Sequence, residues 1–384
     1  MFCRNLRREA APKSNSARAT PRPDRPSGRA SKQDLSHPRI FAKEYPMSPT
    51  VQIAIHPSQF PENVAADLRT SLRSRQVNHK FHYDSYKQTQ KWLALHQACS
   101  PSRTETACAA AYDSSFAAVG KRISSSRIQL ISLGCGGGQK DARLLHGLAQ
   151  AGRQIRYAPL DVSLPMVLIA HQAARAILDP RSATIDAGDF SGLVCDLATA
   201  DDLPDVFADQ SVPGQARLIT FFGMIPNFEP QLILPKLAAL LRAGDYLLFS
   251  ANLAPGNDYA AGVRRVLPLY DNPLTEDWLL TFLLDLGVER SDGNLEWSIE
   301  GSSVTDGLLR LAAYFGFHQP RTLEVDGEQF VFRAGERLRL FFSYRHTPER
   351  LRVLLLSHGL AVQAQWLADS EEEGVFLVQR SAAR

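Results

Sequence analysis

Four glycines between Leu133 and Gln139 form the stretch whose residue types point most directly to chemistry. They occupy positions 134, 136, 137 and 138, directly after an apolar run at 128–133, and a helical pattern begins near Asp141. Glycine accepts positive φ angles and lets the backbone approach a ligand closely. A buried strand, a glycine turn and a helix in this order are typical of nucleotide-cofactor sites in doubly wound α/β folds, although a purely structural turn would use the same residues.

The spacing of the glycines distinguishes two cofactor classes. A dinucleotide fingerprint would need glycine at position 139, which is Gln, so a dinucleotide-dependent oxidoreductase is disfavoured. Gly134, Gly136 and Gly138 instead resemble the first motif of S-adenosylmethionine (SAM) methyltransferases. A second predicted strand ends at Asp161, where an acid can accept hydrogen bonds from both ribose hydroxyls; the same acid could also cap the following helix.

Three further residues extend this candidate cofactor site. Asp189 and Phe190 follow Gly188 at the expected end of a third strand, where the carboxylate could accept from an adenine amino group and the ring could pack on adenine. An ordinary loop acid is the alternative for Asp189. Lys140 lies just past the glycines and could reach the carboxylate of the methionine part of SAM, or it could be a solvated lysine at the start of a helix.

In combination, these motifs resemble the histidine-specific Nα-methyltransferase family, the ergothioneine-pathway type and its relatives. The segments that carry the resemblance are 133–140, 159–163, 188–190 and 221–228, and it extends over roughly residues 81–379. The resemblance implies SAM as cofactor and methylation of the α-amino group of a free amino acid or close derivative. It also implies an α/β fold, namely a Rossmann-like doubly wound, mostly parallel sheet with a second α+β substrate-binding domain.

The pattern of elements predicts the same organisation. Strands expected near 128–133, 155–160, 184–187, 217–222 and 245–251 alternate with helices, which favours a parallel sheet with right-handed crossovers. Extended segments at 294–299, 321–325, 328–333 and 337–344 indicate an α+β insertion. We therefore expect a basic tail at residues 1–46 and a SAM-binding domain at 110–255, to which the chain returns at 345–384. The substrate domain is expected in two pieces, at residues 47–109 and 256–344.

The resemblance also assigns substrate contacts. Tyr83 matches a tyrosine that lines the substrate pocket, and Asn227 matches an asparagine that holds the α-amino and α-carboxylate groups after a loop that begins at Gly223. That loop is one residue shorter here than in the usual family form. Tyr270 matches a tyrosine that binds the carboxylate, and Ser343 matches a serine of the penultimate strand. Read from the residues alone, Tyr83 could be a core tyrosine and Asn227 a turn residue.

Two family contacts to the imidazole of histidine are replaced in this sequence. Ser100 stands where the family has a tyrosine, and Phe341 stands where it has a glutamate. Losing a charged acceptor weakens imidazole binding, which favours an amino acid with an aromatic or apolar side chain. L-histidine itself and a non-catalytic SAM-binding relative remain as alternatives.

Methyl transfer from a sulfonium to an amine is an in-line displacement that depends on alignment more than on a strong base. Asn227 and Tyr83 are accordingly the candidate catalytic residues, through positioning of the amine. The sequence shows no signature of a Ser–His–Asp triad, which agrees with this chemistry. Its ten histidines show no metal-ligand spacing, so no metal is expected.

Charge and cysteine content narrow the remaining classes. The formal net charge is +3, but residues 1–46 carry net +7 and the rest of the chain net −4, so the expected folded part offers no argument for nucleic-acid binding. The tail is expected to be disordered, and it could be a transit peptide, a basic arm or an extension preceding a start at Met47.

Five scattered cysteines without a Cys-x-x-Cys pair indicate a reducing cytoplasm. Small size explains Cys135 in the glycine loop as well as reactivity does. We expect a monomer that binds a small amino-acid substrate, with no membrane partner.

Overall fold

The computed structural model describes residues 51–178, 190–208 and 214–381. Within these ranges the largest sheet has eight strands in the order β1-β4-β3-β2-β5-β6-β13-β12. The first six strands in this order pair in parallel, whereas β13 is antiparallel to both β6 and β12. This arrangement confirms the expected mostly parallel sheet. Its strands are β1 (Ile53–Ile55), β2 (Arg127–Leu133), β3 (Gln154–Asp161), β4 (Gly192–Val194), β5 (Ala216–Phe222), β6 (Tyr246–Asn252), β12 (Leu360–Leu367) and β13 (Glu373–Arg380).

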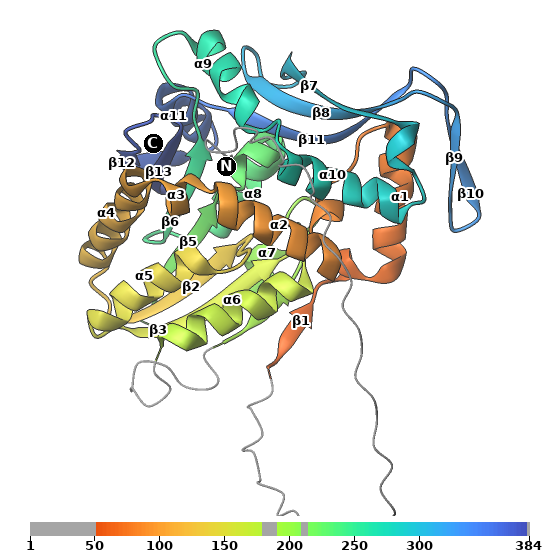
Figure 1. Ribbon diagram of the computed structural model, residues 1–384. Helices are drawn as coiled ribbons and strands as arrows, with labels where there is room; N and C mark the ends of the chain where they lie inside the picture. The colour runs from red at the N-terminus through yellow and green to blue at the C-terminus, as the bar shows by residue number, and fades with distance from the viewer. Residues whose placement is uncertain (1–50, 179–189, 209–213, 382–384) are drawn as a thin grey trace, which may run out of the picture. The chain divides into compact units, whose positions relative to one another are not determined.

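Helices cover both faces of this sheet because its central strands are apolar on both sides (Figure 1). In β2, Leu130 belongs to a core cluster with residues of α4 and α5, whereas the next residue, Ile131, belongs to a cluster with residues of α7, α8 and α11. Alternate residues of a strand point to opposite faces, so one strand contributes to both cores. The covering helices are α4 (Thr106–Arg122), α5 (Gln139–Gln150), α6 (Leu164–Ile177), α7 (Leu203–Ala208), α8 (Pro230–Leu240) and α11 (Pro348–Ser357).

A second α+β layer combines the N-terminal helices with the insertion after β6. Its three-stranded antiparallel sheet has the order β11-β8-β7, and a hairpin of β9 and β10 follows. The indole Nε1 of Trp278 on α10 donates to the backbone oxygen of His82 at 2.8 Å, which joins the two pieces of chain. This layer contains α1 (Pro61–Ser74), α2 (Tyr86–Cys99), α3 (Pro101–Thr104), α9 (Tyr259–Val266), α10 (Pro273–Asp285), β7 (Gly293–Gly301), β8 (Leu309–Phe317), β9 (Arg321–Val325), β10 (Glu328–Phe332) and β11 (Arg337–Arg345).

Two differences from the expected elements affect the site. The strand expected at 184–187 lies outside the described residues, and the strand beside β3 is β4, which starts at Gly192. A Cβ atom at Gly192 would lie 2.7 Å from Cγ1 of Val167, so α6 packs closely on the start of this strand. In addition, β8 and β12 were not anticipated.

No helix within the described ranges is long and apolar enough to cross a membrane.

Candidate active site

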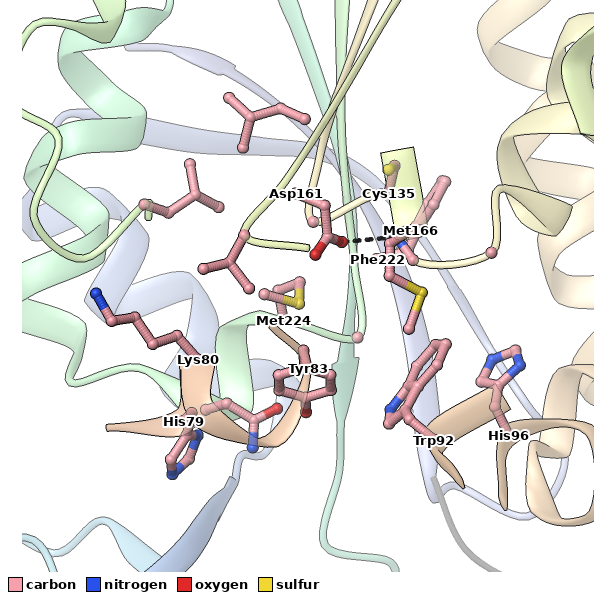
Figure 2. A pocket seen from close by; sticks show the side chains of 18 of the residues that line it. His79, Lys80, Tyr83, Trp92, His96, Cys135, Asp161, Met166, Phe222 and Met224 are labelled. Carbon is pink, nitrogen blue, oxygen red and sulfur yellow. Dashed lines mark hydrogen bonds between the residues drawn. The ribbon is translucent and has the colours of Figure 1, made fainter. Parts of the chain in front are cut away.

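A cavity opens where the parallel strands end (Figure 2). Its floor comes from residues at the carboxyl ends of β2 to β6, where doubly wound folds bind ligands. Its walls come from the α+β layer, with residues of the segment 78–83, α2, α10 and β11. The lining includes His79, Lys80, Tyr83, Trp92, Gly134, Gly136, Lys140, Asp141, Asp161, Met166, Cys195, Asp196, Leu197, Gly223, Asn227, Trp278, Phe341 and Ser343.

The glycine loop uses its freedom from side chains in two ways. Gly134, Gly136 and Gly138 have φ angles of 65°, 51° and 70°, which other residues rarely adopt. A Cβ atom at Gly138 would lie 2.6 Å from the Cα of Ala170, so no side chain fits between the loop and α6. A Cβ atom at Gly136 would lie 3.1 Å from the ring of Trp92. The loop is therefore compressed between α6 and α2, with its backbone at the cavity.

Asp161 ends β3 and holds the glycine loop in place. Its Oδ2 accepts from the backbone N–H of Gly136 at 2.9 Å, and its Oδ1 accepts from the N–H of Ser163 at 3.1 Å. Burial raises the pKa of Asp161 to about 6, while these backbone donors oppose the shift. The helix cap of α6 is Ser163, whose side chain accepts from the N–H of Met166, so Asp161 is not itself the cap. Its carboxylate lines the cavity at the position expected for ribose recognition.

The acid at the end of the next strand is Asp196, which the sequence reasoning missed. It lies 4% exposed just after β4, and Cys195, Asp196 and Leu197 all line the cavity. Its Oδ1 accepts from the N–H of Ala198 at 2.8 Å, while Oδ2 is buried without a hydrogen-bond partner among the described residues. Lys80 balances the charge, with Nζ 3.5 Å from Oδ2. An acceptor oxygen is thus left for a ligand donor.

Of the pair predicted for that role, only Phe190 lies within the described residues. Asp189 lies outside the described residues. Phe190 contacts the rings of Tyr157 and His171 at 6.3 and 4.7 Å between centroids and is not among the residues that line the cavity. Phe190 therefore does not line this cavity, and its contact with adenine stays a prediction. The run 192–197, an apolar strand followed by an acid, carried the same sequence signal as 188–190.

Lys140 lines the cavity as expected, but its ammonium already has partners. It donates to the hydroxyl of Tyr112 at 2.6 Å and lies 3.5 Å from the Glu373 carboxylate. Burial lowers the pKa of Lys140, and the charge of Glu373 opposes that shift. An ammonium has three donors, so one remains for a cofactor carboxylate. The neighbouring Asp141 was also missed by the sequence reasoning.

Asp141 is a structural acid beneath the loop. It is 2% exposed, and it accepts from the hydroxyls of Ser132 at 2.5 Å, Tyr157 at 2.9 Å and Thr220 at 3.0 Å. These three donors come from β2, β3 and β5. Asp141 therefore connects α5 to three strands at the floor of the cavity. Burial raises the pKa of Asp141, and the three hydrogen-bond donors oppose this shift.

Asn227 lies in the loop after β5 and contacts β11. Its Nδ2 donates to the backbone oxygen of Phe342 on β11 at 2.8 Å. Gly223 begins the loop with a φ of 71°, and its N–H donates to the hydroxyl of Ser250 at 2.9 Å. Both residues line the cavity, so the shorter loop still brings Asn227 there.

Aromatic rings form the wall near Asn227. The Tyr83 ring lies 6.1 Å from that of Trp92 and 5.4 Å from that of Trp278, and Phe341 lies 5.6 Å from Trp278. Burial and the nearby Asp161 charge raise the pKa of the Tyr83 hydroxyl well above its usual value. This hydroxyl therefore keeps its proton and can hydrogen-bond, but it cannot serve as a base. Trp92 and Trp278 had no spacing signal in the sequence.

The three remaining predicted contacts divide into one residue on the wall and two behind it. Ser343 lines the cavity, whereas Tyr270 is fully buried and does not. The Tyr270 hydroxyl is 3.0 Å from Oγ of Ser343 and accepts from Arg345 at 2.7 Å, so it supports Ser343 from behind. Ser100 is fully buried and shares a hydrogen bond with Ser102, and it does not line the cavity. The turn between α2 and α3 holds Ser100 away from the expected contact.

Comparison with known proteins gives agreement along most of the chain. The profile of a family described as histidine-specific, SAM-dependent methyltransferase matches residues 62–380. N-methyltransferase imqF of Aspergillus flavus is 25% identical over 261 residues, which cover 66% of this chain and 68% of the relative. N-methyltransferase fsqC of Aspergillus fumigatus is 24% identical over 254 residues, which cover 65% and 66%.

Solved structures align more loosely. The 1,6-didemethyltoxoflavin-N1-methyltransferase of Burkholderia thailandensis, with bound 1,6-didemethyltoxoflavin and S-adenosylhomocysteine, has a TM-score of 0.38 and 13% identity over 84% of this chain and 91% of that one. The magnesium protoporphyrin IX methyltransferase of Synechocystis, with bound S-adenosylhomocysteine (SAH), has a TM-score of 0.32 and 14% identity over 83% and 98%.

Proposed function

The chain belongs to the histidine-specific, SAM-dependent methyltransferase family, and from this premise we propose that it methylates the α-amino nitrogen of a free amino acid or close derivative with an aromatic or apolar side chain. It is a SAM-dependent N-methyltransferase. The observation that carries the proposed substrate class is the replacement of the family's charged acceptor by Phe341 inside an aromatic wall.

The cofactor end of the cavity fits SAM in its donors and acceptors. The glycine loop leaves no room for side chains toward α6, and Asp161 presents a carboxylate beside it. The Oδ2 of Asp196, which pairs with Lys80 but has no hydrogen-bond partner among the described residues, can accept from an adenine amino group. Lys140 has a donor left for the methionine carboxylate. These residues would hold SAM along the ends of β2, β3 and β4.

When bound, SAM supplies an electrophilic methyl group on a sulfonium and leaves as a neutral thioether. The amine must therefore arrive unprotonated and in line, and alignment can contribute roughly 7–11 kcal/mol in favourable intramolecular cases. Asn227 suits the amino and carboxylate end because an amide both donates and accepts. Its hydrogen bond to Phe342 fixes the amide against β11. Tyr83, which retains its proton, can orient the amine by hydrogen bonding.

The side-chain end of the cavity favours rings over ions. Phe341 is 3% exposed and packs among Trp278, Trp297 and Tyr270. A charged or strongly solvated side chain would lose water there without regaining a partner. L-histidine is the second candidate because the family description names that substrate.

The test incubates the full chain with SAM and a panel of amino acids, and mass spectrometry detects gains of one, two or three methyl groups. We expect methylation of aromatic or apolar amino acids in preference to L-histidine. The Asn227→Ala variant should lose at least tenfold in kcat/KM while its dissociation constant for SAM stays unchanged, because Asn227 is not among the residues proposed to hold SAM. Preferred turnover of L-histidine, or SAM binding without methylation of any amino acid, would contradict the proposal.

A further inference from the structure

His79 is a cavity residue to which neither the sequence motifs nor the proposed mechanism gives a role. It begins the 3₁₀ turn η2 (His79–His82), four residues before Tyr83 (Figure 2). Its ring stacks on Phe341 with 5.0 Å between centroids and an interplanar angle of 17°. Because Phe341 stands where the family has its side-chain acceptor, His79 lies next to the surface that should decide which side chain fits.

The hydrogen bonding of His79 fixes its tautomer. The backbone N–H of Phe342 donates to Nε2 at 3.2 Å, so this nitrogen must carry a lone pair. Burial, together with the nearby His82, Arg339 and Arg310, lowers the pKa of His79 well below its usual value. The ring is therefore neutral at pH 7, and its one proton resides on Nδ1.

This Nδ1–H group is a buried donor without an acceptor. Nδ1 has no hydrogen-bond partner among the residues that the structure describes. The two nitrogens lie on different edges of the imidazole, so the contact of Nε2 with β11 leaves the proton on Nδ1 unused. Buried polar groups are almost always paired, and one left unpaired opposes folding or binding until a partner arrives.

We propose that the Nδ1–H group of His79 donates a hydrogen bond to an oxygen acceptor on the aromatic side chain of the substrate. This inference rests on the proposed function and narrows its substrate class to ring-bearing amino acids with a hydroxyl, ether or carbonyl oxygen. The α-carboxylate is the less fitting acceptor, because the proposed function gives that end of the substrate to Asn227. The flat stack of His79 on Phe341 instead places the donor at the edge of the side-chain wall.

The chain allows the donor and the tether to β11 to be tested separately. In His79→Gln, the amide oxygen can replace Nε2 as the acceptor for Phe342 N–H, but no donor remains at the Nδ1 position. In His79→Asn, the amide nitrogen can replace Nδ1 as donor, but the tether is lost. His318→Phe, at an exposed position in the same layer, is the matched control for loss of a histidine.

The measurement compares kcat/KM for tyrosine and phenylalanine, which differ by one ring oxygen. We expect wild type and His318→Phe to favour tyrosine by about tenfold, because a site built to pair a polar group rejects an analogue that lacks it. His79→Gln should bring the ratio close to one by losing activity on tyrosine alone. His79→Asn should keep a preference for tyrosine while losing activity on both substrates.

Each other outcome overturns the proposal. A wild-type ratio near one means that no ring acceptor is recognised. Equal losses on both substrates in His79→Gln mean that His79 acts on the shared amino-acid end or only supports the fold. If amino acids are methylated without this preference, the inference fails alone; if SAM binds and no amino acid is methylated, the proposed function fails with it.

Discussion

Replacing Asp196 by Asn tests the cofactor end of the cavity with little disturbance to the fold. Asn has the same shape as Asp, and its Oδ1 can keep the hydrogen bond from Ala198 N–H that is now 2.8 Å long. Only Oδ2, which has no hydrogen-bond partner among the described residues, becomes an NH₂ group. The substitution therefore changes the acceptor offered to the ligand into a donor.

The expected effect follows from the type of bond that is lost. A hydrogen bond to a charged group contributes about 1.5–3 kcal/mol, which corresponds to a roughly 10- to 150-fold rise in the dissociation constant for SAM. The ion pair of Lys80 with Asp196 is also lost. Lys80 keeps its contact with Asp67 at 2.5 Å, so the stability loss should stay below the 3–5 kcal/mol of a buried charge left unpaired.

Calorimetric titration with SAM and with SAH, together with chemical unfolding, measures both quantities. Phe190→Leu is the matched control, because Phe190 packs on Tyr157 and His171 rather than lining the cavity. We expect this variant to lose stability while its affinity for SAM changes by no more than about twofold. Unchanged affinity in a folded Asp196→Asn protein, or a large loss of affinity in Phe190→Leu, would refute the assignment.

Three further predictions concern the rest of the cavity. Phe341→Glu should raise kcat/KM for L-histidine by about tenfold or more, because it restores a charged acceptor. Ser100→Tyr should mainly lower the melting temperature, since Ser100 is fully buried outside the cavity lining. Equal gains in kcat/KM in both variants would contradict this placement. Affinity for SAM should fall by up to tenfold per pH unit below about pH 6, because the pKa of Asp161 is raised to about 6 and only its ionised form accepts from two hydroxyls. Titration calorimetry at pH 5 to 8 measures this dependence, and Asp161→Asn should make the affinity independent of pH in this range. Gly138→Ala should cost about 2–4 kcal/mol of unfolding free energy, from a positive φ and a Cβ 2.6 Å from Ala170 Cα; chemical unfolding that shows less than about 1 kcal/mol would rule out the close contact.

The cofactor half was predictable because its signals are local. The glycine loop follows β2 directly in the chain, and Asp161 ends β3, so a strand pattern and a few residues sufficed to place both at one edge of the sheet. The same kind of signal occurred twice between residues 184 and 197. Strand pairing decides between such candidates, and β4 begins at Gly192 because it pairs with β1 and β3, whose partner residues lie 139 and 33 residues away in the chain.

The substrate half was less predictable because its residues come from distant segments. Tyr83 and Asn227 reached the cavity, as the resemblance implied. Tyr270 lies one layer behind Ser343, and a match in sequence cannot show that depth. His79, Trp92 and Trp278 carry no spacing signal, since only the packing of α2, α10 and β11 brings them to the same wall.

The segment from His79 to Tyr83 connects the two ends of the cavity. Lys80 pairs with Asp196 at the cofactor end, while His79 and Tyr83 contact Phe341 and Trp278 of the aromatic wall. Any coupling that this segment carries between the two ligands is reciprocal. SAM would then change the affinity for the amino acid by the same factor as the amino acid changes the affinity for SAM.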